Sequence, residues 1–274
     1  METVKLYNGE ITVLKKGHSY YREDGSRIED SVTGIIKILD KTALKYWAAN
    51  LCGEHIFDNW NVEKKYTEAE KLIIAKEGSR KHSEYMQQKA TSGTAVHKFA
   101  EEFVNGLNPV IPKEEQARNG VVAFQKWWNE TNIKVVKTER IVYSRRYDVI
   151  GTCDVDAKIK GKFCVVDYKT SSVYKKAKFW EREEYPDGFV KNENGELVKY
   201  PVWNETKLQV AAYRGFLQEE TGEEYGDSLV VRFDKDFGDF FVEVLPAQEQ
   251  DRFYQAFLHL VPVKRLLDKY KIDW

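Results

Sequence analysis

The stretch of residues 149–170 reads VIGTCDVDAKIKGKFCVVDYKT and carries a clear β-hairpin pattern. Its first half alternates between two sets of side chains from residue 149 to residue 157, as a β-strand does. A turn at Lys160-Gly161-Lys162 follows, and residues 163–170 return as a second strand. The stretch therefore predicts a β-hairpin whose odd-numbered residues 149–157 share one face and whose even-numbered residues share the other.

Two carboxylates and a lysine stand on this hairpin. Asp167 and Lys169 are two residues apart and are expected to project from one face. If Asp154 faces the same way, one Mg²⁺ or Mn²⁺ can bridge both aspartates, with the Tyr168 backbone carbonyl as a further oxygen ligand. Lys169 would then hold or help deprotonate the attacking water and stabilise charge on the phosphate. A solvated edge hairpin with paired Asp and Lys is the alternative, but the preceding Val165-Val166 favours an interior strand.

Two predicted helices supply further residues. Upstream, residues 92–103 (SGTAVHKFAEEF) carry apolar side chains at helical spacing, so we expect Thr94 to cap a helix and His97 to lie in its first turn. A neutral imidazole there suits a divalent cation and favours manganese over magnesium. Downstream, residues 206–217 predict an amphipathic helix with Gln209 and Tyr213 four apart on one face.

In chain order these motifs read G-T-x-x-H, G-x-x-D, D-Y-K-T and Q-x-x-x-Y, and they span residues 97–213. Together they resemble the PD-(D/E)XK nuclease superfamily. Within it they are similar to the RecB-like exonuclease branch, which includes the mitochondrial genome-maintenance exonuclease and phage and CRISPR-associated RecB-like nucleases. The resemblance implies an α/β fold with a restriction-endonuclease-like mixed β-sheet flanked by helices, and an N-terminal helical subdomain.

The resemblance also assigns roles to residues. It implies metal binding by His97, Asp154, Asp167 and the Tyr168 backbone carbonyl, and catalysis by Asp154, Asp167, Lys169, Gln209 and Tyr213. Glu139, on the predicted strand 135–142, matches a carboxylate often present in the family. The second acidic position is Asp167 where many relatives have Glu, which shortens its reach by one methylene and leaves the metal geometry open.

Cofactor expectations follow from the same comparison. Several members of the branch hold an iron–sulfur cluster on four cysteines. This chain has only Cys52, Cys153 and Cys164, so we expect no iron–sulfur cluster and assign the thiols to packing. The expected cofactor is Mg²⁺ or Mn²⁺.

Composition bounds the rest. With 274 residues, 42% of them hydrophobic, the chain is expected to form one nuclease domain over 1–274: an N-terminal hairpin and helical cap (1–90), a catalytic core (91–245) and a C-terminal helix (246–274). The odd, low cysteine count, the start without a signal-peptide pattern and the lack of a long apolar run predict a cytoplasmic protein with no membrane association. Similarity to compact phage-borne members suggests the host-cell cytoplasm.

The net charge of −1 does not by itself indicate a nucleic-acid binder. Local basic clusters do. We expect DNA contacts from residues on either side of the hairpin, where cations stand beside an aromatic ring able to stack on unpaired bases: Arg145, Arg146, Lys175, Lys176, Lys178 and Trp180. Solvated surface charge is the alternative for each cluster.

Further elements are expected around this core. A long polar helix is predicted over 67–90, a small protruding hairpin around Asn194-Gly195, a strand pair over 228–234 and 239–245, and a helix from Ala247 to about Tyr270 that Pro262 kinks.

The expected function is metal-dependent exonucleolytic hydrolysis of DNA, with single-stranded ends inferred from the resemblance and roles in repair or recombination. A structure-selective endonuclease, or a non-catalytic nucleic-acid-binding recombination protein, is the alternative. Polarity, DNA against RNA, oligomeric state and protein partners stay open. A second metal would need more carboxylates, for which Asp156 and Glu101 are candidates.

Overall fold

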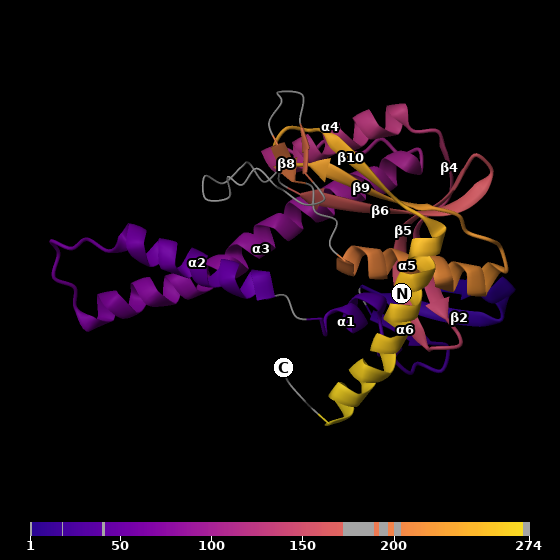
Figure 1. Cartoon of the computed structure of the whole chain (residues 1–274), viewed down its shortest axis with the longest axis horizontal. Coiled ribbons are helices and arrows are strands. Elements are labelled where there is room, and N and C mark those ends of the chain that lie inside the picture. The colour runs from indigo at the N-terminus through magenta and orange to yellow at the C-terminus, as the bar shows by residue number, and fades with distance from the viewer. Residues whose placement is uncertain are drawn as a thin grey trace. The chain divides into compact units, whose positions relative to one another are not determined.

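The computed structural model of the chain describes residues 2–17, 19–39, 42–171, 189–191, 197–199 and 204–270. These residues divide into two compact units, one of residues 1–38 with 96–274 and one of residues 39–95. Figure 1 shows the elements of both. The division by contacts does not test whether the whole chain works as one nuclease domain, which stays a prediction.

A mixed five-stranded sheet forms the centre of the first unit (Figure 1). Its order is β10-β9-β6-β5-β4, and neighbours are antiparallel except for the parallel pair β6 and β9. The strands are β4 (Ile133–Ser144), β5 (Val149–Ile159), β6 (Lys162–Ser171), β9 (Ser228–Asp234) and β10 (Phe240–Leu245). The hairpin predicted over 149–170 is confirmed as β5–β6, and both of its strands lie inside the sheet.

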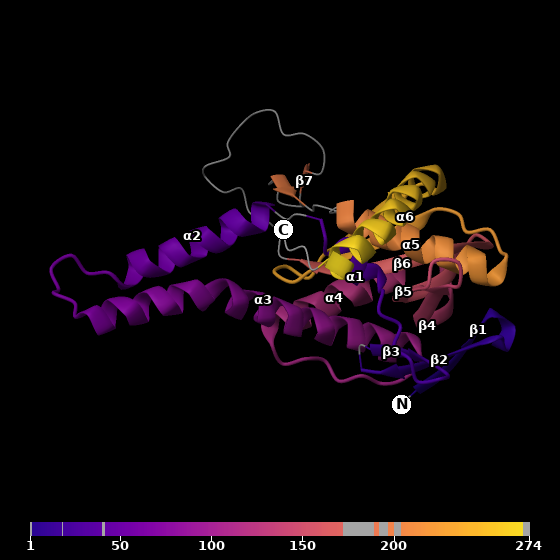
Figure 2. The same cartoon turned by 90° about the horizontal axis from the view of Figure 1, so that it is seen from below.

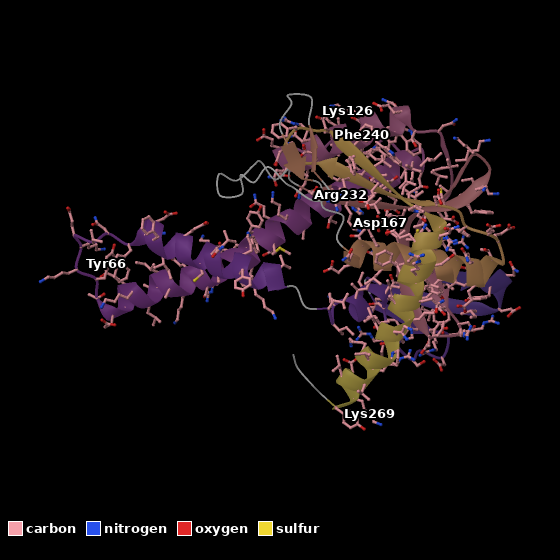
Figure 3. All side chains as sticks on the ribbon, viewed as in Figure 1. Tyr66, Lys126, Asp167, Arg232, Phe240 and Lys269 are labelled. Carbon is pink, nitrogen blue, oxygen red and sulfur yellow. The ribbon has the colours of Figure 1, made fainter. Side chains whose placement is uncertain are left out.

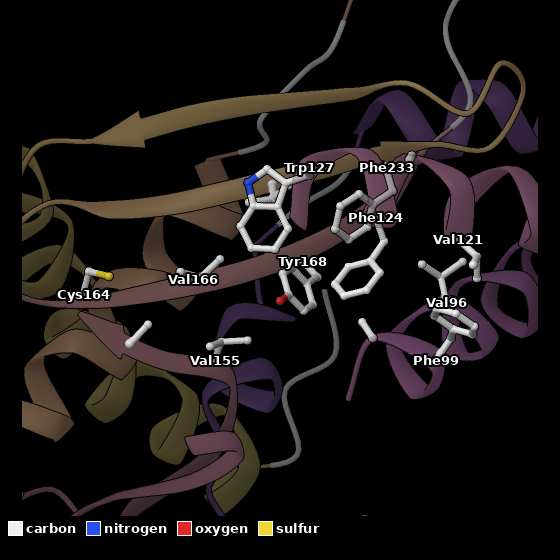
Figure 4. Packing of buried hydrophobic residues seen from close by; sticks show 14 residues of the cluster. Val96, Phe99, Val121, Phe124, Trp127, Val155, Cys164, Val166, Tyr168 and Phe233 are labelled. Carbon is white, nitrogen blue, oxygen red and sulfur yellow. The ribbon is translucent and has the colours of Figure 1, made fainter. Parts of the chain in front are cut away.

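Helices cover both faces of this sheet (Figure 2). The last turns of α3 (Glu68–Val104) and the whole of α4 (Glu115–Glu130) lie on one face. There, Phe124 and Trp127 of α4 pack on Tyr168 of β6, as Figure 4 shows. On the other face lie α5 (Asn204–Thr221) and α6 (Ala247–Tyr270), because Lys169, the neighbour of Tyr168, contacts α5 and successive residues of a strand point to opposite faces. The α/β class with a mixed sheet flanked by helices is confirmed.

A second, three-stranded antiparallel sheet lies at the N-terminus. It comprises β1 (Glu2–Leu6), β2 (Ile11–Lys16) and β3 (Ser19–Arg22), with the short 3-10 helix η1 (Tyr7–Gly9) between the first two. Its Leu6 and Val13 pack against Ile141 of β4 and Ile150 of β5. The short helix α1 (Val32–Ile36) follows, with the Ser31 hydroxyl accepting a hydrogen bond from the Gly34 amide.

The helix that carries His97 begins far earlier than predicted. One continuous helix, α3, replaces the two expected over 67–90 and from Thr94, so His97 is in its last turns and Thr94 caps nothing. The Ala-Thr-Ser-Gly-Thr segment resembled a break because Ser and Thr compete for backbone hydrogen bonds. Here the hydroxyls of Thr91 and Ser92 donate to carbonyls one turn back, at Gln87 and Lys89, and the helix continues.

The remaining elements match expectation closely. In the insert, β7 (Phe189–Lys191) and β8 (Leu197–Lys199) pair antiparallel, and the turn predicted at Asn194-Gly195 lies outside the described residues. Helix α6 runs from Ala247 to Tyr270 with Pro262 inside it. The other helix of the second unit is α2 (Thr42–Asn59). Among the described residues, no helix combines the length and apolar character that crossing a bilayer requires.

Candidate metal and catalytic site

Three side chains from three separate elements converge beside the hairpin. His97 of α3, Glu139 of β4 and Asp154 of β5 each offer one ligand atom, and these atoms all lie within 4.8 Å of one another. His97 Nδ1 is 3.7 Å from Asp154 Oδ1. The side chains are partly exposed, 30% for His97 and 16% for Asp154, so solvent and ligands reach them. One imidazole and two carboxylates form a group that can hold a divalent metal ion.

Core packing places His97 in this group. Its helical neighbours Val96 and Phe99 are buried in the cluster of α3, α4 and the sheet. The imidazole lies edge-on to the buried ring of Tyr168, with 6.0 Å between ring centroids. The same apolar contacts that fix α3 on the sheet therefore fix the imidazole beside Asp154.

Glu139 stands at an irregular point of β4. The ladder pairs Thr138 with Val155 and Arg140 with Cys153, so Glu139 lies opposite Asp154 in register. Its φ of +44° is rare for a residue with a side chain and marks local strain. Burial, reinforced by the negative charges of Asp154 and Glu101, raises the pKa of Glu139 to about 7. The carboxylates of Glu139, Asp154 and Glu101 repel one another here, and a bound cation would reduce that repulsion.

Removing the Glu139 charge should stabilise the metal-free protein. Its carboxyl has a pKa of 4.5 when unfolded and about 7 when folded, so its contribution to stability is full below about pH 4.5 and is lost as the pH rises through 7. We expect Glu139→Gln to unfold at a higher temperature than wild type at pH 8 in chelator, with the difference shrinking towards pH 4.5. With excess Mn²⁺ at pH 8 the order should reverse. Thermal unfolding of both proteins measures this, and equal midpoints at pH 8 would contradict it.

A second group of contacts begins on the neighbouring strand. Lys169 Nζ lies 2.6 Å from Asp167 Oδ2 and donates a long hydrogen bond to Gln209 Oε1 at 3.4 Å. Gln209 Nε2 in turn donates to the Tyr213 hydroxyl at 2.9 Å. Asp167 is 1% exposed, whereas the Lys169 side chain is 29% exposed. The structure thus brings together the four residues that the sequence assigned to catalysis beside Asp154.

The charges of these residues follow from their surroundings. Burial raises the pKa of Asp167, and the Lys169 ammonium offsets this only in part. Burial also lowers the pKa of Lys169, but the carboxylates of Asp167 and Asp154 outweigh it and the net shift is upward. Burial raises the pKa of Tyr213 well above its usual range. At neutral pH Lys169 is therefore a cation and Tyr213 a neutral hydroxyl.

Asp154 links the two groups. Its Oδ2 accepts a hydrogen bond from the Tyr168 backbone N–H at 2.7 Å, and its negative charge raises the pKa of Asp167. The β5–β6 ladder runs from Ile159–Lys162 only as far as Val155–Val166, so the strands separate just before the site. Asp167 is not part of the group of three, and whether one ion bridges both aspartates stays a proposal.

The alternation predicted for residues 149–157 is wrong around Asp154. A Cβ on Gly151 would lie 2.6 Å from Cε1 of Tyr213 on the α5 side, whereas Val155, also odd-numbered, packs in the α3 and α4 cluster on the other side. Pairing to β6 ends at this level and the ladder to β4 skips Glu139. Without regular partners on either side, β5 changes the face that its residues present.

Gly151→Ala should therefore disturb the site. The new methyl group would lie 2.6 Å from the ring of Tyr213, which is buried and held by Gln209. We expect a loss of about 1–3 kcal/mol in unfolding free energy and slower turnover. Gly226→Ala is the matched control, because its methyl group would approach nothing closer than 3.7 Å. Denaturant unfolding of both variants tests this, and equal stabilities would refute it.

Asp156 is unavailable as a ligand. It is fully buried, where Arg140 donates to Oδ2 and the Tyr225 hydroxyl donates to Oδ1 at 3.1 Å. The suggestion that it holds a second metal is therefore wrong. Glu101, one turn after His97, is near enough for its charge to raise the pKa of Glu139.

Sequence reasoning missed Arg232. This residue is buried on β9, and Figure 3 labels it together with Asp167 of β6. It pairs with Lys169 in the parallel ladder, and its charge lowers the pKa of Lys169. No local pattern reveals it, because more than 50 residues separate β6 from β9 in the sequence.

The DNA contacts stay a prediction. Arg145 forms an ion pair with Glu10 at 2.6 Å and lies over the Tyr7 ring, and Arg146 lies over the Tyr147 ring. The other four residues, Lys175, Lys176, Lys178 and Trp180, lie outside the described residues.

Two of the cysteines have surroundings that explain them by packing. Cys153 and Cys164 are buried, the latter in the main core, and burial raises the pKa of Cys164 to about 12. Such a thiol is inert at neutral pH. Cys52 is partly buried.

The chain matches no protein-family model and no curated protein sequence at a significant level. Among solved structures it is similar to a protein of Eubacterium rectale described as a candidate exonuclease, with 13% identity and a TM-score of 0.41. That similarity covers 72% of this chain and 74% of the other. It is too weak to support any functional argument, which has to come from the site.

Proposed function

We propose that this chain is a Mg²⁺- or Mn²⁺-dependent deoxyribonuclease that hydrolyses phosphodiester bonds, acting as an exonuclease on single-stranded DNA ends. One observation carries the proposal: the potential ligands His97, Glu139 and Asp154 lie beside the buried carboxylate of Asp167 and its partly exposed ion-pair partner Lys169. A structural metal group has no need of a lysine cation next to it. Hydrolysis of a phosphate ester does, because negative charge grows on the phosphate as water adds.

The residues fit a divalent ion. The donors are one imidazole nitrogen and carboxylate oxygens, a set suited to Mn²⁺ and, less well, to Mg²⁺. Asp167 Oδ1 is buried and has no hydrogen-bond partner among the described residues, so it can accept a further positive partner. A bound ion would withdraw charge from the phosphate and make a nearby water more acidic.

The chain's own residues have distinct tasks in this reaction. The water oxygen forms a bond to phosphorus while the bond to the leaving oxygen breaks, and a proton from the water ends on solvent or the leaving oxygen. Lys169, a cation at neutral pH, stabilises the charge that develops on the phosphate oxygens. Gln209 Oε1 accepts a hydrogen bond from the Lys169 ammonium, and the Tyr213 hydroxyl accepts one from Gln209 Nε2, so both residues orient Lys169. Asp167 keeps Lys169 charged.

End-labelled linear and covalently closed circular DNA, each single- or double-stranded, test the proposal. Incubation with Mn²⁺ should release mononucleotides or short products from linear single strands and leave circles intact. Lys126→Ala, which removes a surface ion pair to Asp239, should act like wild type. Digestion of circles would point to an endonuclease. Stable DNA binding with no cleavage in any metal would point to a non-catalytic binding protein.

A further inference from the structure

Residues 39–95 form a unit without a hydrophobic core. It consists of α2, the turn after it and the first part of α3. Of its described residues only Gly78 and Ser92 are buried, and no large apolar side chain is. Two helices that touch along one line cannot enclose a core, and isolated helices are marginal in water. This hairpin of helices therefore lacks the packing that usually stabilises one.

Many of the large apolar side chains of this unit are exposed. Nine of the 19 exposed large hydrophobic side chains in the described part of the chain belong to it: Leu44, Tyr46, Phe57, Trp60, Val62, Leu72, Ile73, Tyr85 and Met86. Tyr46 (70% exposed) and Phe57 (81%) are about three turns apart on α2 and share one side of it. Leu72 and Met86 are about four turns apart on α3 and also share a side. On that side of each helix, the residues between the members of the pair are small or polar, so each helix presents separate exposed apolar side chains there and no continuous stripe.

Charge decides which class of partner fits. Residues 39–95 contain nine Lys and Arg against eight Asp and Glu. Three of the lysines form ion pairs with glutamates of the same unit, namely Lys64–Glu70, Lys71–Glu68 and Lys81–Glu84. A polyanion or an anionic membrane is attracted by a strongly positive surface, whereas the formal excess in this unit is a single positive charge. A balanced surface also brings no strong repulsion when it meets its own copy.

We propose that the helical hairpin of residues 39–95 associates with the same hairpin of a second copy of this chain, so that two pairs of helices form a four-helix bundle. Two-fold symmetry presents the same exposed apolar side chains from both sides, and each hairpin supplies apolar surface that the other lacks. Tyr46, Phe57 and Trp60 alone expose roughly 400 Å², about half of what one partner buries in a stable dimer of ordinary size. The other six side chains enlarge that area.

Sedimentation equilibrium of the full chain between about 1 and 100 µM tests the proposal. The wild type should be a dimer. Tyr46→Ser with Phe57→Ser should raise the dimer dissociation constant at least about 100-fold, because both rings are exposed in the monomer and buried only in the dimer. Far-ultraviolet circular dichroism should show unchanged helicity. Leu107→Ser with Val110→Ser removes side chains exposed to a similar extent, outside this unit, and should leave the dimer intact.

A second double variant, Leu72→Ser with Met86→Ser, should weaken the dimer in the same way. It keeps the test decisive if the variant with both Tyr46→Ser and Phe57→Ser does not fold. A wild type that is monomeric at the highest concentration overturns the proposal. So does a dimer that survives both double variants. A monomer whose Tyr46 and Phe57 variant loses affinity for a single-stranded oligonucleotide would overturn the proposal and show that nucleic acid covers these side chains instead.

Discussion

Lys169→Met is expected to slow DNA cleavage by about a thousandfold or more while Mn²⁺ still binds. Lys169 Nζ lies 2.6 Å from Asp167 Oδ2, and the carboxylates of Asp167 and Asp154 keep it protonated. Without it, the growing charge on the phosphate loses the cation that lies beside Asp167. Single-turnover cleavage of an end-labelled single strand measures the loss, and the rise of the unfolding temperature with added Mn²⁺ measures metal binding.

Two comparisons make this result specific. Lys126→Met removes another lysine that pairs with an aspartate, at the surface, and should cleave at the wild-type rate. Lys169→Arg retains the charge beside Asp167 and should stay folded. It therefore distinguishes a loss of catalysis from a loss of stability caused by leaving the buried Asp167 carboxylate unpaired. A Lys169→Met protein that keeps more than about a tenth of the wild-type rate would remove the lysine from the mechanism.

Asp154→Asn is expected to abolish both metal binding and cleavage. The change replaces a charged ligand oxygen in the group with His97 and Glu139 by a neutral amide. The amide oxygen can still accept the Tyr168 N–H bond, so the local strand geometry should survive. We expect at least about a hundredfold weaker Mn²⁺ binding and a cleavage rate at least about a thousandfold lower.

Manganese titration followed by electron paramagnetic resonance measures free Mn²⁺ directly. Asp239→Asn is the control, since it removes a surface carboxylate that pairs with Lys126 and touches none of the site residues. Wild-type affinity in Asp154→Asn would mean that the ion, if it binds, sits elsewhere.

The hairpin at the centre of the sheet could be predicted because its information is local. Strand period, a glycine turn and an apolar start to the second strand lie within 22 residues, and the structure forms β5 and β6 from them. The helices bearing His97 and Gln209 were also visible as apolar periodicity. Their convergence on the hairpin was not, and it came from a resemblance rather than from spacing.

What the sequence misjudged depends on contacts between distant segments. The strands around Asp154 lose their ladder because side chains take over the hydrogen bonds, as the Tyr168 N–H shows. That irregularity lets Glu139, which adjacent motifs do not mark, turn towards His97 and Asp154 with a φ of +44°. Arg232 reaches Lys169 only through the parallel pairing of β6 and β9.

The start of α3 was misplaced for the opposite reason. Local propensity argued for a break near Thr94, but the hydroxyls of Thr91 and Ser92 are satisfied inside the helix. Packing of Val96 and Phe99 then holds the last turns on the sheet. His97 is thus positioned by the core, and not by a helix cap.

Anomalous X-ray diffraction from crystals grown with Mn²⁺ tests directly whether His97, Glu139 and Asp154 hold a metal ion. We expect one strong anomalous peak within about 2.5 Å of a His97 ring nitrogen and of carboxylate oxygens of Glu139 and Asp154. A second, weaker peak near Glu101 would be compatible with this expectation. A map with no peak between these three residues at saturating Mn²⁺, or a peak only at a distant surface carboxylate, would contradict it.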